Sequence, residues 1–199
     1  MFFRLVTITG ILFIFFFTGC RDLTVENQES QDFDKVFSNP ALVSDYASAT
    51  FRILHNAMQE NSGPALAMGA MADQLTCSWG TAGQKDLSSE PRKSFPNDIS
   101  WPYYPIYEKF WTDLYQAINR ANDILLLLEK EDAELNYSAE MLKSWSYFIS
   151  GVAHGYIGLV FDQGDIVDFD PENDTLELLP WSEMISKSRE FLDKSIAIA

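Results

Sequence analysis

The chain has 199 residues, of which 14 are lysine or arginine and 29 are aspartate or glutamate, so its formal net charge is −15. This acidity argues against nucleic acid as a partner, because phosphate binding needs clustered basic residues. It also argues against attachment of the polypeptide to an anionic membrane by charge alone. The length suits one domain with a core of its own.

The N-terminus has the pattern of an export signal. Arg4 precedes an uncharged apolar run over residues 5–18, which as a helix would span about 21 Å and fall short of the ~30 Å hydrocarbon core of a bilayer. A cysteine follows small residues at the end of the run, in the order Phe17, Thr18, Gly19, Cys20. This resembles the lipobox of bacterial lipoproteins, with phenylalanine in the usual leucine position. We expect residues 1–19 to be a signal peptide and Cys20 to become the lipid-bearing first residue; an ordinary secretory signal is the alternative.

The chain has two cysteines. If Cys20 carries lipid it cannot form a disulfide, so Cys77 would be a lone thiol. A nucleophilic thiol needs a histidine as its base, and only His55 and His154 are available. We expect Cys77 to be a small buried residue instead.

Residues 20–38 are polar and acidic with sparse apolar side chains, and we interpret them as a lipidated tether that partly packs on the body. Asn39 and Pro40 then form a helix start, since asparagine is a good N-cap and proline suits the first helical position. Apolar residues recur at helical spacing to about residue 60. A second, short helix is predicted from Pro64 to about residue 76. Residues 77–103 are polar and broken by glycine and proline, which predicts a long loop without regular structure.

Three further helices follow in the sequence. Pro105 opens the most regular of them, which ends in charged residues after Leu128. Ser138 is expected to cap the next helix, whose apolar face is interrupted by glycines that imply close approach of a neighbouring helix: Gly151, Gly155 and Gly158. Residues 162–179 are predicted to be an acidic loop, and Pro180 opens a last helix. No run of alternating residues indicates a strand. The fold class is therefore all-α, with antiparallel helix pairs joined by long irregular loops, as in a tetratricopeptide-like α-solenoid.

One helix carries a more specific pattern. Its spacing "W-x-x-x-Y-x-x-I-x-x-A-N" resembles a signature of the SusD/RagB family and is formed by Trp111, Tyr115, Ile118, Ala121 and Asn122. The lipobox and the order of the helices agree with that family. The segment Phe161, Asp162, Gln163, Gly164, Asp165 is similar to the family's "FGD-x-P" turn, but Gln163 is inserted and no proline follows closely.

The resemblance implies a function. Members of the SusD/RagB family are surface-exposed outer-membrane lipoproteins that bind glycans or peptides and deliver them to a TonB-dependent β-barrel transporter of the SusC type; they are not enzymes. Members are typically more than twice this length, so we expect residues 39–199 to be the N-terminal helical part of such a protein. The alternative is a helical-repeat lipoprotein that binds only protein partners as a scaffold in outer-membrane assembly.

Glycan binding needs flat aromatic faces beside hydrogen-bonding groups. The long loop offers such groups at its ends, and the candidate ligand-binding residues are Trp79, Arg92, Asn97, Asp98, Trp101, Tyr103 and Tyr104. The alternative is that these aromatic residues seal the loop onto the helices. Trp111, Tyr115 and Trp145 lie on helical faces, and we expect them in the core.

Metal and catalytic motifs are weak. The acidic loop places oxygen-bearing side chains at alternate positions, with Asp168, Asp170 and Glu172 as candidate calcium ligands. The spacing departs from an EF-hand loop, so a solvated acidic loop is the preferred interpretation and no cofactor other than the lipid on Cys20 is expected. The sequence has no phosphate-binding glycine motif and no nucleophile elbow.

Overall fold

We describe the protein from a computed structural model, over residues 36–59, 64–75, 83–91, 98–130, 135–169 and 176–199. All of these lie in the compact unit Phe33–Ala199. The predicted signal peptide, Cys20 and Cys77 lie outside the described residues. At the end of the predicted tether, Val36 and Phe37 are described and buried, and they pack beside Val43.

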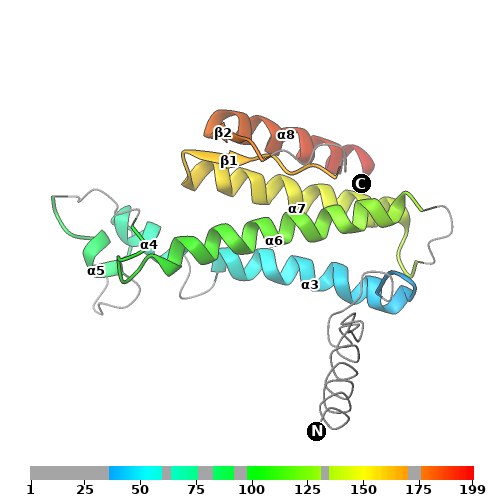
Figure 1. Ribbon diagram of the computed structural model, residues 1–199, viewed down its shortest axis with the longest axis horizontal. Coiled ribbons are helices and arrows are strands. Elements are labelled where there is room, and N and C mark those ends of the chain that lie inside the picture. Colours follow the sequence, from blue (N-terminus) through cyan, green and yellow to red (C-terminus); the bar gives the residue numbers. More distant parts are fainter. Residues whose placement is uncertain (1–35, 60–63, 76–82, 92–97, 131–134, 170–175) are drawn as a thin grey trace, which may run out of the picture. The chain divides into compact units, whose positions relative to one another are not determined.

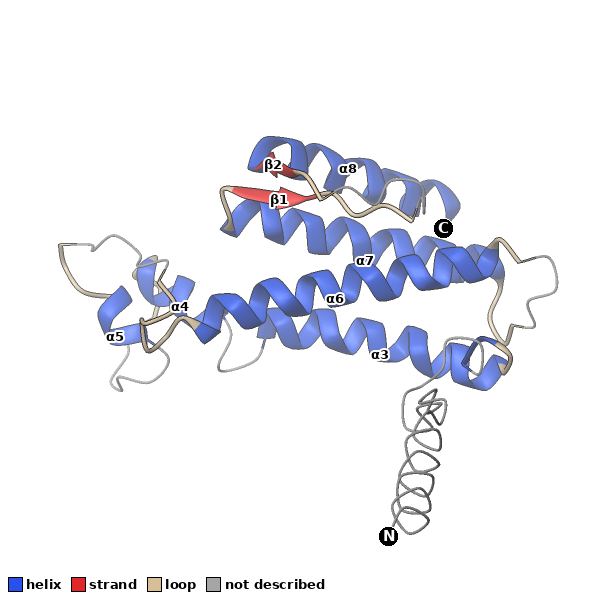
Figure 2. Ribbon diagram, viewed as in Figure 1, coloured by secondary structure: helices blue, strands red, loops and turns tan. Residues whose placement is uncertain are grey.

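Long helices build the described part of the fold (Figures 1 and 2). They are α3 (Pro40–Gln59), α6 (Pro105–Leu128), α7 (Ala139–Val160) and α8 (Trp181–Ile198). Helix α6 packs against both α3 and α7, and α8 packs on α7. The all-α class is confirmed, and the starts of these helices agree with the sequence; the tetratricopeptide-like arrangement stays a prediction.

The shorter elements differ from the sequence-based expectation. Helix α4 (Pro64–Met71) ends earlier than predicted, because Asp73 has a left-handed φ of 57° and the amides of Gln74 and Leu75 turn back onto the Gly69 carbonyl. The described part of the long loop includes a short helix, α5 (Gln84–Leu87). These predictions were wrong in detail because single turns are too short to show a period.

The acidic loop was also wrongly predicted to lack strands. Strand β1 (Gln163–Asp165) pairs antiparallel with β2 (Leu178–Pro180), and Gly164 lies opposite Leu179. Each strand has only three residues, so no alternation of polar and apolar positions could reveal it. Strand β1 contacts α7 and α8.

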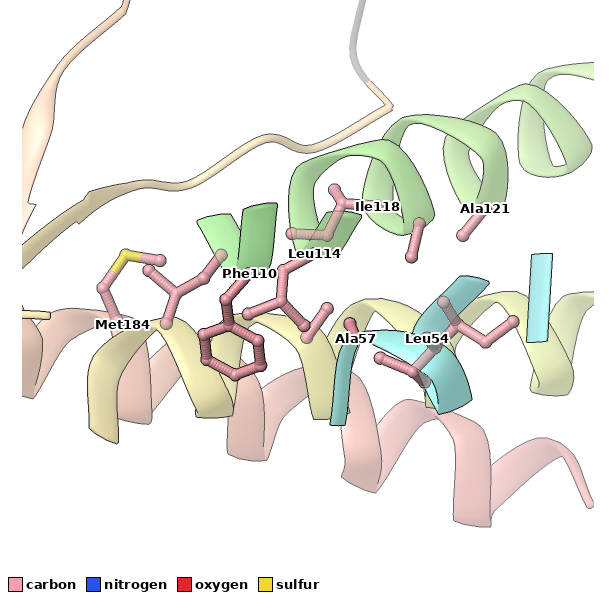
Figure 3. Packing of buried hydrophobic residues seen from close by; sticks show 11 residues of the cluster. Leu54, Ala57, Phe110, Leu114, Ile118, Ala121 and Met184 are labelled. Atoms are coloured by element: carbon pink, nitrogen blue, oxygen red, sulfur yellow. The ribbon is translucent and has the colours of Figure 1, made fainter. Parts of the chain in front are cut away.

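The main core lies where α3, α6, α7 and α8 meet (Figure 3). Leu54 of α3, Leu114 of α6 and Ile149 of α7 are completely buried there. Burial of a side chain of this size contributes roughly 2 kcal/mol to stability. Not every residue of the predicted apolar faces is covered, since Leu159 and Ile196 are both 73% exposed.

The glycines of α7 explain how closely α8 approaches. A Cβ atom at Gly151 would lie 2.8 Å from Leu192 Cγ, and one at Gly158 would lie 2.9 Å from Met184 Cβ. Ser188 of α8 donates a hydrogen bond to the Gly151 carbonyl over 2.7 Å. The predicted close approach of a neighbouring helix is therefore confirmed.

The predicted cap of α7 is also present, because the Ser138 hydroxyl accepts a hydrogen bond from the Met141 amide over 3.1 Å. We expect Ser138→Ala to lower the free energy of unfolding by about 1 kcal/mol, since that amide loses its acceptor. Chemical denaturation measures the change. Ser138→Asp is the control, because aspartate retains an acceptor at this position; equal losses in the two variants would contradict the capping role.

Candidate functional site

Three polar side chains hold one extended segment against the helices. The segment is residues 165–167, which begin with the last residue of β1. Tyr115 and Asn122 of α6 are two turns apart and so lie on one face of their helix. The Tyr115 hydroxyl contacts Asp165, the Asn122 amide donates to the Val167 carbonyl over 3.3 Å, and His154 of α7 accepts from the Val167 amide over 3.3 Å. We call residues 165–167 the strap.

The Tyr115 hydroxyl makes two hydrogen bonds to the main chain of Asp165. It donates to the Asp165 carbonyl over 3.0 Å and accepts from the Asp165 amide over 2.7 Å. Burial raises the pKa of Tyr115 to about 12, so the hydroxyl is protonated at neutral pH and can donate. Tyr115 and Asn122 both belong to the W-x-x-x-Y-x-x-I-x-x-A-N pattern of α6, and both hold the strap by hydrogen bonds.

We expect Tyr115→Phe to lower the free energy of unfolding by about 1–2 kcal/mol, because both main-chain groups of Asp165 lose their partner. Urea denaturation followed by far-ultraviolet circular dichroism measures it. Tyr137→Phe is the matched control at an exposed tyrosine. If both variants were as stable as the native protein, the hydroxyl would not hold the strap.

His154 is completely buried in α7. Its Nδ1 donates to the Ser150 carbonyl over 2.7 Å, while its Nε2 accepts from the Val167 amide. The two bonds define a neutral ring that carries its proton on Nδ1. Burial lowers the pKa of His154 to about 4, although Asp168 and Asp165 act in the opposite direction. His154 is thus a structural residue that joins the strap to α7.

A groove of about 970 Å³ lies beside the hairpin. It is bounded by α4, the first turns of α6, the end of α7 and the hairpin. Its described lining residues are Met68, Met71, Tyr104, Tyr107, Glu108, Trp111, Thr112, Leu159, Val160, Phe161, Asp162, Gln163 and Leu178. Aromatic and apolar walls with a few polar groups are typical of binding sites for organic ligands.

The aromatic wall of the groove is tied to the core. Trp111 packs against Tyr115 at a centroid distance of 4.8 Å and edge-on against Phe161 at 4.9 Å. Burial raises the pKa of Tyr107, another wall residue, to about 12. Trp111 therefore packs against the main core, as predicted, and also lines the groove.

The described lining of the groove carries acidic side chains but no basic ones. Glu108 and Asp162 line it, and none of its described lining residues is a lysine or arginine. Carboxylates beside a half-enclosed surface attract basic groups and repel anions. The groove therefore suits a neutral or positively charged ligand.

Of the predicted ligand residues that the structure describes, Tyr104 lines this groove, whereas Asp98, Trp101 and Tyr103 are not among its lining residues. Trp101 packs edge-on against Tyr103 at 5.3 Å, and Tyr103 covers Gly83. The Asp98 carboxylate accepts from the Ser100 amide over 2.8 Å, which lowers the pKa of Asp98. The remaining predicted residues, Trp79, Arg92 and Asn97, lie outside the described residues.

Several groove residues were missed by the sequence analysis. Tyr107 sits one helical turn from Trp111, so an aromatic pair at the start of a helix was a usable signal. Phe161 and Gln163 come from a segment distant in sequence, and no local pattern places them beside α6.

The candidate calcium ligands are only partly described. Asp168 forms an ion pair with Lys187 over 3.1 Å and accepts from the Phe169 amide. Asp170 and Glu172 lie outside the described residues. Within the described part of the chain, no three histidine, cysteine, aspartate or glutamate side chains gather closely enough to hold a metal ion.

Comparison with known proteins does not assign the chain to a family. No family model matches the chain, and neither a curated protein nor a solved structure matches it. Among the described helices, none is both long and apolar enough to cross a membrane.

Proposed function

We propose that this protein is a lipid-anchored, surface-exposed outer-membrane protein. In this proposal it binds glycan or oligopeptide nutrients in the groove and passes them to a TonB-dependent transporter of the SusC type. Cys20 carries the lipid. The protein acts by reversible binding and has no catalytic role.

The observation that carries the ligand-binding part is the groove itself. It combines aromatic faces from Tyr104, Tyr107 and Trp111 with hydrogen-bonding groups of Glu108 and Gln163. Aromatic faces stack on sugar rings or on apolar side chains, and polar groups fix orientation. The export signal ending in Cys20 and the SusD/RagB-like pattern of α6 support the cellular part of the proposal.

Ligand binding can be tested on the full mature chain in mild detergent. The probes are maltohexaose, cellohexaose, chitohexaose and a tryptic digest of casein, and native mass spectrometry detects what is retained. We expect retention of at least one probe, with a loss of about tenfold in Tyr104→Ala, because a buried aromatic contact contributes roughly 1 kcal/mol or more. Tyr137→Ala removes an exposed tyrosine outside the groove lining and is the control.

Retention that is equal in Tyr104→Ala and in the native protein would place binding elsewhere. No retained probe in any variant would count against nutrient binding. It would favour the alternative of a scaffold that binds only proteins.

A further inference from the structure

The hydrogen-bond register of the hairpin shows which way each main-chain group points. The Trp181 amide donates to the Asp162 carbonyl over 2.9 Å. In an antiparallel pair, hydrogen-bonded and non-hydrogen-bonded residue pairs alternate. Gly164 and Leu179 are therefore the next hydrogen-bonded pair, and Gln163 opposite Pro180 is a non-hydrogen-bonded pair. The amide and carbonyl of Gln163 point away from β2, toward the open edge of β1.

Asp165 confirms this direction independently. It occupies the next non-hydrogen-bonded position, and both of its main-chain groups meet the Tyr115 hydroxyl on α6. The open edge of β1 thus faces α6. Gln163 lies two residues earlier along that edge, and Trp111 lies one turn earlier than Tyr115 along α6. Both residues line the groove.

The Gln163 main chain therefore offers the groove a donor and an acceptor. Among the described residues, neither its amide nor its carbonyl has the side-chain partner that Tyr115 provides for Asp165. A strand edge of this kind pairs with an extended peptide, which presents a matching carbonyl and amide on one residue. An oligosaccharide without N-acetyl groups, such as maltohexaose, has no amide with which to make this pair.

We propose that the groove binds an oligopeptide in extended conformation, whose main chain pairs with the amide and carbonyl of Gln163. This rests on the proposed function and narrows it to one ligand class. The acidic lining formed by Glu108 and Asp162 selects lysine or arginine side chains. The apolar side chains of Met68, Leu159 and other lining residues accept an apolar neighbour.

The test uses the full mature chain in mild detergent and a fluorescein-labelled library of hexapeptides built from leucine, methionine, lysine and arginine. Fluorescence anisotropy gives the affinity. Gln163→Pro removes the amide that points into the groove, whereas the hairpin bonds do not use it and edge strands tolerate proline. Gln163→Ala keeps the main chain and is the matched control. Because alanine removes only the side chain, we expect Gln163→Pro to weaken binding about tenfold more than Gln163→Ala does.

A change in the ligand tests the reciprocal hydrogen bond, in which a peptide amide donates to the Gln163 carbonyl, without altering the protein. A library with N-methylated amides lacks main-chain donors but keeps its carbonyls, so it should bind about tenfold more weakly than the unmodified library and still be weakened by Gln163→Pro. Urea denaturation verifies that Gln163→Pro remains folded. If that variant unfolds, the affinities of the native protein for the two libraries remain as the test of main-chain pairing.

The possible failures are distinct. Equal binding of both libraries by the native protein would overturn main-chain pairing. No binding of either library, with retention of an oligosaccharide that Tyr104→Ala abolishes, would overturn the peptide assignment and leave the proposed function standing. No binding of any probe in the groove would count against both.

Discussion

Gly158→Val is expected to lower the free energy of unfolding by about 3 kcal/mol, the largest effect of any single substitution considered for this protein. A Cβ atom at this position would lie 2.9 Å from Met184 Cβ and 3.0 Å from the Trp181 carbonyl oxygen. The carbonyl belongs to the main chain of α8, so it cannot move aside as a flexible side chain can. The two added methyl groups must push α8 away from α7, and such overpacking typically costs 1–3 kcal/mol or more.

Urea denaturation of Gly158→Val measures this loss. Valine has a higher intrinsic helix propensity than glycine, so propensity alone would not lower the stability at this position. Lys143→Val places the same side chain at an exposed site of the same helix and is the control, with an expected loss below about 1 kcal/mol. If the two variants lost equal stability, the α7–α8 contact at Gly158 would not be as close as described.

The second large effect concerns pH. His154 has a folded-state pKa of about 4 because it is buried, whereas an unperturbed histidine has a pKa of about 6.5. Above about pH 6.5 the ring is neutral in both states, and its contribution to stability is complete. As the pH falls from about 6.5 toward 4, the unfolded state takes up a proton that the folded state does not. The free energy of unfolding therefore decreases, by roughly 3 kcal/mol in total.

Urea denaturation between pH 7 and pH 4 measures this dependence in the native protein and in His154→Gln. Carboxylates also titrate in this interval, so the difference between the two proteins isolates the histidine. His55→Gln, at an exposed histidine of α3, is the matched control. A His154→Gln variant whose stability fell as steeply as that of the native protein would contradict a buried, neutral His154.

The helices could be predicted because their signals are local. The apolar stripe of α6 recurs at every turn, and Leu114, Ala117, Ile118 and Ala121 from that stripe are all completely buried. Pro105 and Ser138 fix where two helices begin by their own backbone and side-chain chemistry. The glycine spacing of α7 implied a close neighbour, although it did not identify α8.

The groove and the strap could not be predicted in the same way, because they join residues far apart in the sequence. Tyr115 and Asp165 meet only once α6 lies beside the hairpin. His154 looked like an isolated histidine, and only the fold supplies its two main-chain partners. The expected binding residues were sought in one long loop, whereas most of the groove lining comes from helix ends and the hairpin.

Gln163 lies in β1, between Phe161 of the aromatic wall and Asp165 of the strap.

The most direct test of the proposed function is co-purification from the native outer membrane. The membrane is solubilised in mild detergent, the protein is captured with a specific antibody, and partners are identified by mass spectrometry. If the proposed function is right, a TonB-dependent barrel is recovered in comparable amount, and the N-terminal residue of the captured protein is lipid-modified Cys20. Recovery of outer-membrane assembly subunits instead, or of the protein alone with an unmodified Cys20, would contradict it.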